Sequence, residues 1–287
     1  KQAVAIMDKA GNIEKYINNP IIDGAPVDMT GEIRDPFVFR KDEKYYMLLG
    51  AKSKKEKGAL LLYTSENLLK WDYIGEISLS IDTGYMLECP SFIEVDGKDV
   101  MILSPMGLEK EELKYQNQFS TLYLVGKLDI ENMKFDLEYM DEVDSGFDFY
   151  ASQAFYGKGN KPMMVSWFGC GEQDLPTDKE MWKHGLTMPH NLKLVENRLC
   201  NFVSEELNDL FNDKNEFNSN IIKTKSNYYH IQFNMCKEDE NTWVRFGNED
   251  DYWELNFNFD KNVIQLDRSN LKLKVDINNG LKRCTEG

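Results

Sequence analysis

The sequence predicts an all-β fold in which strands of a β-propeller are followed by strands of a β-sandwich. Short apolar or β-branched runs bounded by Gly, Asp or Asn recur along the chain, a pattern typical of strands. An acidic residue also opens the same kind of unit three times, at Asp35, Glu88 and Asp148. Repeats of roughly 40–60 residues that consist of short strands are typical of propeller blades.

The three units share a layout. An acidic residue leads into an apolar strand, a polar turn and a second apolar strand, over residues 35–50, 88–103 and 148–167. In the first two units a third strand and a less regular edge strand follow, at 59–64 and 71–77, and at 120–126 and 135–139. Since equivalent positions in successive blades surround one axis, we expect the three acids to point into one pocket.

The character of the sequence changes after residue 202, where the predicted propeller domain (1–202) ends. Ser204 is a good N-cap and apolar residues follow at helical spacing, so we assign residues 203–216 to a helical connector. Residues 217–287 show the alternating patterns of a β-sandwich but are fewer than the ~100 residues common for that fold, which predicts an incomplete domain. Its strands are expected at 228–235, 242–247, 252–257 and 263–267.

Composition narrows the class of protein. The 287 residues carry a net charge of −15, which argues against nucleic acid or an anionic membrane as a partner, and no apolar run is long enough to span a membrane. The five cysteines are scattered and form no Cys-x-x-Cys motif, so we expect free thiols in a reducing cytoplasm. The three histidines lack metal-ligand spacing, and nothing in the sequence calls for a metal or another cofactor.

Three motifs taken together resemble glycoside hydrolase family 32, which includes invertases, sucrose-6-phosphate hydrolases and fructanases. They are Arg-Asp-Pro at 34–36, Glu-Cys-Pro at 88–90 and Gly-Phe-Asp-Phe-Tyr-Ala at 146–151. Weaker matches extend the resemblance over nearly the whole chain, at 16–22, 63–71, 167–169, 176–189 and 266–269. The resemblance implies a five-bladed β-propeller with a C-terminal β-sandwich, and cleavage of a β-fructofuranosidic bond with retention of configuration.

The resemblance also implies roles for individual residues. Glu88 would be the general acid/base, and Asp35 would hold sugar hydroxyls and stabilise the oxocarbenium-like transition state. Arg34 would position the acid/base or the substrate. Asp148 either binds sugar hydroxyls or caps a blade turn, and Trp167 either stacks on a sugar or belongs to the core. The expected partner is sucrose, sucrose-6-phosphate or a related β-fructoside.

The chain departs from the family pattern at the nucleophile. In the family this residue is the Asp of an Asn-Asp-Pro-Asn-Gly motif, which is absent from the 287 residues; Asn18-Asn19-Pro20 corresponds to a later segment. We therefore expect a chain that lacks the first blade, most of the second blade and the latter half of the sandwich. Such a chain would be inactive by itself, because the retaining pathway begins with the nucleophile.

Two alternatives to a catalytic fragment remain open. The first is a non-catalytic carbohydrate-binding or self-associating remnant of such an enzyme. An open propeller would expose strand edges, which proteins normally cover or pair, so a homo-oligomer is expected. The second is a related five-bladed arabinanase or xylosidase, against which the Glu-Cys-Pro motif weighs.

Cys89 beside the acid/base has no His partner apparent in the sequence, which indicates a packed side chain rather than a nucleophile.

Overall fold

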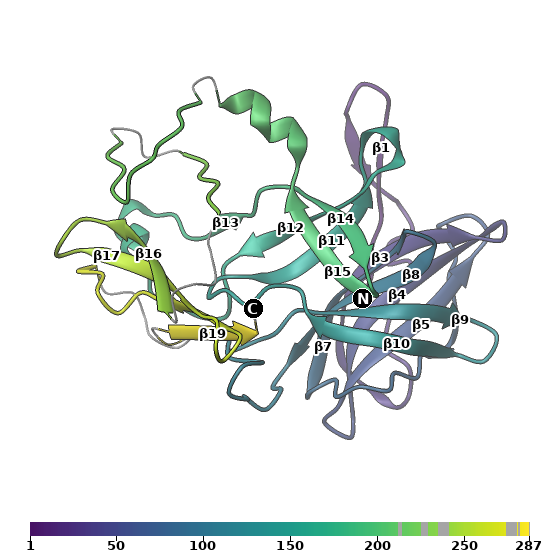
Figure 1. Ribbon diagram of the computed structural model, residues 1–287. Coiled ribbons are helices and arrows are strands. Elements are labelled where there is room, and N and C mark those ends of the chain that lie inside the picture. Colours follow the sequence, from purple (N-terminus) through teal and green to yellow (C-terminus); the bar gives the residue numbers. More distant parts are fainter. Residues whose placement is uncertain (212–213, 225–228, 235–240, 274–279, 281, 287) are drawn as a thin grey trace.

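The computed structural model describes residues 1–211, 214–224, 229–234, 241–273, 280 and 282–286, and these form an all-β structure of separate antiparallel sheets (Figure 1). Two of the sheets are four-stranded meanders. The first comprises β3 (Met29–Lys41), β4 (Lys44–Ser53), β5 (Gly58–Ser65) and β6 (Asp72–Glu76). The second comprises β7 (Met86–Val95), β8 (Lys98–Met106), β9 (Leu122–Asp129) and β10 (Lys134–Glu142). The acid-led units therefore become blades, as predicted.

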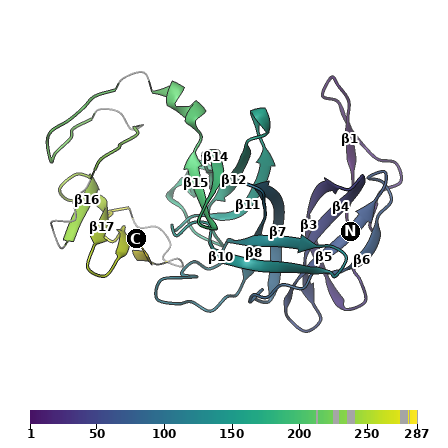
Figure 2. The same cartoon turned by 45° about the vertical axis from the view of Figure 1, so that its right-hand side comes forward.

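The third blade is less regular. It comprises β11 (Tyr150–Tyr156), β12 (Pro162–Phe168), β14 (His190–Val195) and β15 (Arg198–Val203), with the short β13 (Gly185–Leu186) beside β12. The 3-10 helices η1 (Lys158–Asn160) and η2 (Pro176–Glu180) lie in its connections. In each blade the first strand is at one edge of the sheet, and β7 contacts both β3 and β11. The three first strands are thus neighbours around the propeller axis (Figure 2).

The blades are held together by side chains that alternate along the central strands. Leu48 and Leu60 pack towards the second blade, whereas Leu49 and Leu61 pack on the other face of the first sheet. A further apolar cluster joins the second blade to the third, through residues such as Ile102. Because both faces of the central strands are covered, these strands read as continuous apolar runs in the sequence rather than as alternating ones.

A fourth sheet, the C-terminal sheet, comprises β16 (Asn241–Gly247), β17 (Tyr252–Asn258), β18 (Val263–Asp267) and β19 (Lys282–Glu286). The strands predicted at 242–247, 252–257 and 263–267 are confirmed. The strand predicted at 228–235 is wrong for 229–234, and residues 228 and 235 lie outside the described residues. Alternation alone predicted that strand, but residues 229–234 are exposed and pair with no other described strand, and a strand requires partners for its backbone groups.

Two smaller elements complete the fold. The 3-10 helix η3 (Glu205–Leu210) lies in the segment assigned to a helical connector. Near the N-terminus, β1 (Ala5–Met7) and β2 (Ile13–Lys15) form a hairpin that projects from the first blade (Figure 1). Within the described ranges, no helix has the length and apolar character needed to cross a membrane.

Candidate active site

The first strands of all three blades carry the same irregularity. On β3, three steps from Arg34 to Phe37 face two steps on β4, from Gly50 to Leu48. The register shifts in the same way between Glu88 and Ser91 on β7, and between Tyr150 and Gln153 on β11. Each shift is a β-bulge, in which one extra residue redirects the neighbouring side chains.

The extra residue has a positive φ angle in each strand, at +57° for Asp35, +46° for Cys89 and +55° for Ala151. A non-glycine residue in this region is uncommon, and strain of this kind gathers at functional sites. Three blades that keep the same strained conformation indicate that the fold uses the bulge to aim side chains at the propeller axis.

The bulges correct the predicted repeat. Asp35, Glu88 and Asp148 do not occupy equivalent positions, because Asp35 is itself the bulged residue and Glu88 precedes its bulge by one. Asp148 lies before the start of β11. The equivalent of Glu88 in the first blade is Arg34 and in the third blade Tyr150. The predicted repeat was aligned on the three acidic residues, and this alignment is out of register with the bulges.

The three equivalent residues form a continuous chain of polar contacts. Arg34 Nη1 lies 2.9 Å from Glu88 Oε1, as both a hydrogen bond and an ion pair. Tyr150 Oη lies 3.1 Å from Glu88 Oε2. The carboxylate is therefore held by a cation from one neighbouring blade and a phenol from the other, with its side chain 16% exposed. Tyr150 was not among the residues predicted for the site, so the sequence motifs did not reveal this contact.

Asp35 is joined to Glu88 by the next residue along β7. The amide of Cys89 donates a hydrogen bond to Asp35 Oδ2 at 2.9 Å, and the Cys89 thiol donates to the same oxygen at 3.5 Å. Burial, together with the negative charge of Asp35, raises the pKa of the Cys89 thiol. Cys89 is thus a neutral thiol that orients Asp35, which agrees with the predicted absence of a nucleophilic role.

The Tyr150 side chain is also held in place, by burial and by its hydrogen-bond acceptors. The side chain is buried, and burial followed by the charge of Glu88 raises the pKa of the Tyr150 phenol, so the phenol keeps its hydrogen. The backbone carbonyl of Ser104 offers a second acceptor to that hydrogen at 3.2 Å. Tyr150 can therefore donate either to Glu88 or to Ser104.

A glycine sets the distance between the first two blades at this point. Gly50 pairs with Arg34 across β3 and β4. A Cβ atom on Gly50 would lie 2.3 Å from the carbonyl oxygen of Leu87 and 3.1 Å from the Cα atom of Glu88. Real Cβ atoms do not approach a backbone so closely, so glycine at this position allows the two blades to bring Arg34 and Glu88 together.

The remaining two predicted residues lie beside this chain of polar contacts and are not part of it. Asp148 Oδ2 lies 3.6 Å from Arg268 Nη1, a contact with the residue that follows β18 of the C-terminal sheet. Trp167 is the partner of Tyr150 across β11 and β12, with ring centroids 6.3 Å apart, and packs edge-on against His184 at 4.7 Å. Among the described residues, no hydrogen bond or ion pair joins Asp148 or Trp167 to Asp35 or Glu88.

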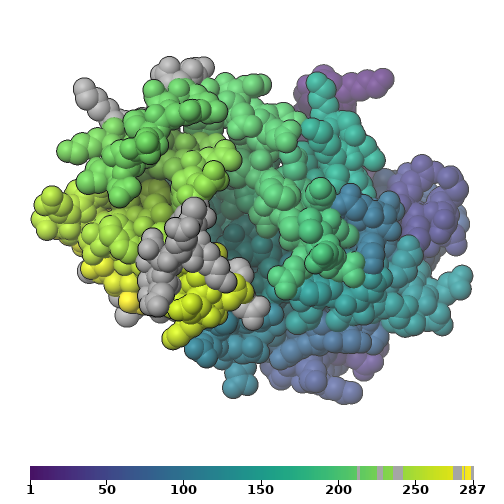
Figure 3. Space-filling view, in the orientation of Figure 1, coloured from purple at the N-terminus to yellow at the C-terminus, as the bar shows by residue number. Residues whose placement is uncertain are grey.

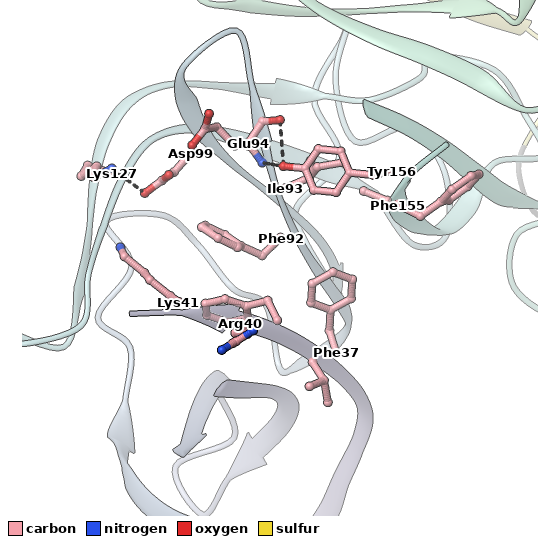
Figure 4. Close-up of a pocket in the computed structure, with 13 residues that line it drawn as sticks. Phe37, Arg40, Lys41, Phe92, Ile93, Glu94, Asp99, Lys127, Phe155 and Tyr156 are labelled. Carbon is pink, nitrogen blue, oxygen red and sulfur yellow. Dashed lines mark hydrogen bonds and ion pairs between the residues drawn. The ribbon is translucent and has the colours of Figure 1, made fainter. Parts of the chain in front are cut away.

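A cavity of about 580 Å³ lies further along the same first strands (Figure 4). Phe37, Phe92 and Phe155 contribute to it from three different blades, and Tyr156 bridges two blades through hydrogen bonds with the Glu94 backbone. The five predicted site residues do not line it. Its lining includes two carboxylates, Glu94 and Asp99, but Asp99 is paired with Lys127 at 3.5 Å, so the polar chain at the bulges is the better candidate for chemistry.

The described residues contain no group of three His, Cys, Asp or Glu side chains arranged to hold a metal ion. The four cysteines among them, Cys89, Cys170, Cys200 and Cys284, form no disulfide.

Comparison with known proteins identifies the family. The profile of the glycosyl hydrolases family 32 N-terminal domain matches residues 1–203. The chain belongs to glycosyl hydrolase family 32. The resemblance carried by the three sequence motifs is thereby confirmed, and so is the predicted all-β fold of propeller and sandwich strands.

Among curated members of family 32, sucrose-6-phosphate hydrolase from Staphylococcus xylosus is 33% identical over 199 residues, which are 69% of this chain and 40% of that protein. Sucrose-6-phosphate hydrolase from Pediococcus pentosaceus is 35% identical over 212 residues, which are 73% of this chain and 42% of that protein. The chain thus spans somewhat less than half the length of these two relatives.

The solved structure of sucrose-6-phosphate hydrolase from Lactobacillus gasseri superposes with a TM-score of 0.83 at 25% identity. It covers 99% of this chain, whereas this chain covers 60% of it. A family 32 β-fructofuranosidase from Bombyx mori shows the same fold, with a TM-score of 0.81 at 24% identity.

Proposed function

We propose that this chain carries the acid/base part of a β-fructofuranosidase site that acts on sucrose-6-phosphate, sucrose or a related β-fructoside. The observation that supports this most is the position of Glu88 between Arg34 and Tyr150, at three equivalent bulges around the propeller axis. Both carboxylate oxygens have fixed partners. A group that must protonate a leaving oxygen at one defined point requires such orientation.

Tyr150 suits a carboxyl group that alternates between two protonation states. When Glu88 is ionised, the phenol donates its hydrogen to Oε2, since a charged acceptor forms the stronger bond. When Glu88 carries a proton, it can donate to the phenolic oxygen while Tyr150 donates to the Ser104 carbonyl. In both states Glu88 Oε2 and the Tyr150 hydroxyl have a partner, which is what a residue that acts first as acid and then as base needs.

Asp35 is assigned to transition-state stabilisation. Its Oδ2 atom is held by the Cys89 amide and thiol, so the other oxygen is the one that a sugar hydroxyl would reach. A fixed carboxylate beside the developing positive charge of an oxocarbenium-like transition state lowers its energy without reorganisation. Arg34 keeps its role as the residue that positions Glu88.

The sugar contacts proposed for Asp148 and Trp167 have less support. Asp148 contacts Arg268, and Trp167 packs against Tyr150 across β11 and β12. For both residues, these contacts agree better with a structural role than with sugar binding. We retain them as residues of the site's surroundings.

Sucrose-6-phosphate is the first substrate to test, because the curated relatives from Staphylococcus xylosus and Pediococcus pentosaceus are sucrose-6-phosphate hydrolases. We further propose that the 287 residues bind a fructoside without hydrolysing it, because they contain no Asn-Asp-Pro-Asn-Gly motif to supply the nucleophile. The free thiols fit the proposed cytoplasmic location.

The test compares the 287-residue chain with a chimera in which residues 1–203 replace the matching segment of the Pediococcus pentosaceus enzyme. Hydrolysis of sucrose, sucrose-6-phosphate and inulin is measured for each. We expect turnover by the chimera alone, with a loss of at least a hundredfold on Glu88→Gln, which preserves the shape of the side chain. Hydrolysis by the chimera that survives Glu88→Gln would disprove the assignment of the acid/base.

The second candidate, a self-associating or carbohydrate-binding protein, is favoured by the N-terminal hairpin. In the described residues β1 and β2 pair only with each other. Ile6 is 54%, Met7 66% and Ile13 68% exposed. Strands with open edges and apolar faces favour pairing with another chain. Sedimentation at increasing concentration should therefore show a homo-oligomer that dissociates in the Met7→Lys, Ile13→Lys double variant; a monomer throughout would exclude this candidate.

A further inference from the structure

The C-terminal sheet contacts the propeller at the segment that leads into β11. This segment, residues 145–150, ends at Tyr150, whose phenol reaches Glu88. Contacts between the sheet and the segment occur at successive positions rather than at one point. Figure 3 shows the C-terminal sheet, in yellow, packed against the blue-green part of the propeller.

Arg268, directly after β18, contacts two consecutive residues of the segment. Its guanidinium carbon lies 3.8 Å from the centroid of the Phe147 ring, and its Nη1 atom lies 3.6 Å from Asp148 Oδ2. The guanidinium is itself oriented by two hydrogen bonds to the Gly280 carbonyl, at 2.9 and 3.3 Å. The side chain of Arg268 is only 10% exposed. Both contacts are therefore shielded from water, and a contact of this kind is strongest when water is excluded.

Arg283, on β19, contacts the segment from a second direction. Its guanidinium carbon lies 4.8 Å from the Phe147 centroid, and Nη2 donates to Asn117 Oδ1 at 2.7 Å. Asn117 in turn donates to the Gly146 carbonyl at 2.8 Å. Two arginines of the C-terminal sheet therefore hold Phe147, which is itself buried.

We infer that Arg268 and Arg283 of the C-terminal sheet are positioning residues, which fix the segment 145–150 so that Tyr150 meets Glu88. The inference rests on the proposed function, because it takes Glu88 as the acid/base. Phe149 packs in the core between the second and third blades, so the segment is fixed from within by Phe149 and from outside by the two arginines. Loss of the outer contacts would allow Tyr150 to withdraw from Glu88 while the blades stay folded.

The competing explanation is that the two arginines only attach the C-terminal sheet to the propeller. The two explanations differ in what happens at Cys89, next to Glu88. Cys89 is a partly buried thiol beside Tyr150 and bonded to Asp35. If Tyr150 withdraws, Cys89 becomes more accessible to alkylation, whereas Cys200 on β15 is unaffected.

The experiment uses the whole 287-residue chain and follows alkylation of each cysteine by iodoacetamide at pH 8.5, with the sites separated by mass spectrometry. Arg268→Met should accelerate modification of Cys89 at least threefold and leave the rate at Cys200 unchanged. Arg268→Lys, which keeps a positive charge near Asp148, should restore part of the protection. Tyr150→Phe should accelerate Cys89 alone, and Arg268→Met combined with Tyr150→Phe should add nothing further, because both act through the same contact.

Arg245→Met is the matched control. Arg245 lies on β16 of the same sheet and has the same kinds of partners, an ion pair with Glu254 at 3.2 Å and the Tyr252 ring at 3.8 Å, but neither partner belongs to the propeller. Its replacement should leave Cys89 protected. Any of three results would overturn the inference. The alkylation rate of Cys89 could be unchanged in Arg268→Met, or the rate at Cys200 could rise as much as the rate at Cys89. The effects of Arg268→Met and Tyr150→Phe on the Cys89 rate could also multiply in the double variant. The readout needs no sugar, so it fails or succeeds independently of the hydrolysis assay above.

Discussion

Tyr150 of the third blade lies 3.1 Å from Glu88 of the second blade, measured from Oη to Oε2. Both residues directly precede the bulge in the first strand of their blade. Two side chains from distant parts of the sequence therefore meet because the propeller repeats one local backbone conformation. The same conformation places Arg34 of the first blade on the other oxygen of Glu88.

Replacement of Tyr150 by Phe should lower the free energy of unfolding by about 2 kcal/mol, because a buried hydrogen bond to a carboxylate is lost and Glu88 keeps an unpaired oxygen. Urea denaturation at pH 7 measures the change. Tyr156→Phe is the matched control, since its hydroxyl also joins β11 to β7 but at an exposed position; it should cost less than about 0.5 kcal/mol. Equal losses in both variants would show that Glu88 gains nothing special from Tyr150.

The blades were predictable because strand runs and turns are local signals. Continuous apolar runs such as residues 47–50 are buried, as expected for central strands. The register of the active site was predicted wrongly because the acids were used to align the repeats. Pro36 and Pro90 give the correct alignment. Proline within a strand is confined to edges and bulges, so the two prolines mark equivalent bulges and pair Asp35 with Cys89.

The contacts of Asp148 and Arg268 could not be predicted from the sequence. They join a residue just before β11 to a residue just after β18, far apart in the chain, and no local pattern records such a pairing. The strand predicted at 228–235 failed for a related reason. Alternation shows that a segment could be a strand, but pairing with a neighbour decides whether it becomes one.

Asp35 has two separable roles, an acceptor for the Cys89 amide and a residue at positive φ. Asp35→Asn keeps an acceptor and tolerates the left-handed region, so it should change the free energy of unfolding by less than about 1 kcal/mol. Asp35→Ala removes both the acceptor and the tolerance of positive φ, and should cost about 2 kcal/mol. Thermal and urea unfolding of the two variants measures these losses against the loss of the charge alone. If the Asn variant is as unstable as the Ala variant, the carboxylate charge rather than the hydrogen bond stabilises this turn.

Gly50→Ala should separate the first two blades at the site. The new methyl group would lie 2.3 Å from the Leu87 carbonyl oxygen, and relief of such overlap in a packed core typically costs about 1–3 kcal/mol. Gly31→Ala is the matched control on β3, because a Cβ atom there meets nothing within 4 Å. The loss should appear in urea unfolding for Gly50→Ala alone. A Gly50→Ala chain as stable as the Gly31→Ala chain would mean that β7 can shift freely.

Glu142 should make the protein less stable as the pH rises from about 4.5 to 7. Burial raises the pKa of Glu142 from 4.5 to about 7, despite a hydrogen bond from the Tyr115 amide. In that pH window the unfolded chain has lost the proton that the folded chain keeps, so ionisation favours unfolding. The penalty is complete above pH 7 and amounts to about 3 kcal/mol.

Glu142→Gln keeps the acceptor and cannot ionise, so its free energy of unfolding should equal that of the wild type at pH 4 and exceed it at pH 8. Urea unfolding at both pH values measures the difference, and a variant that gains nothing at pH 8 would show that the folded protein accommodates the ionised carboxylate without cost.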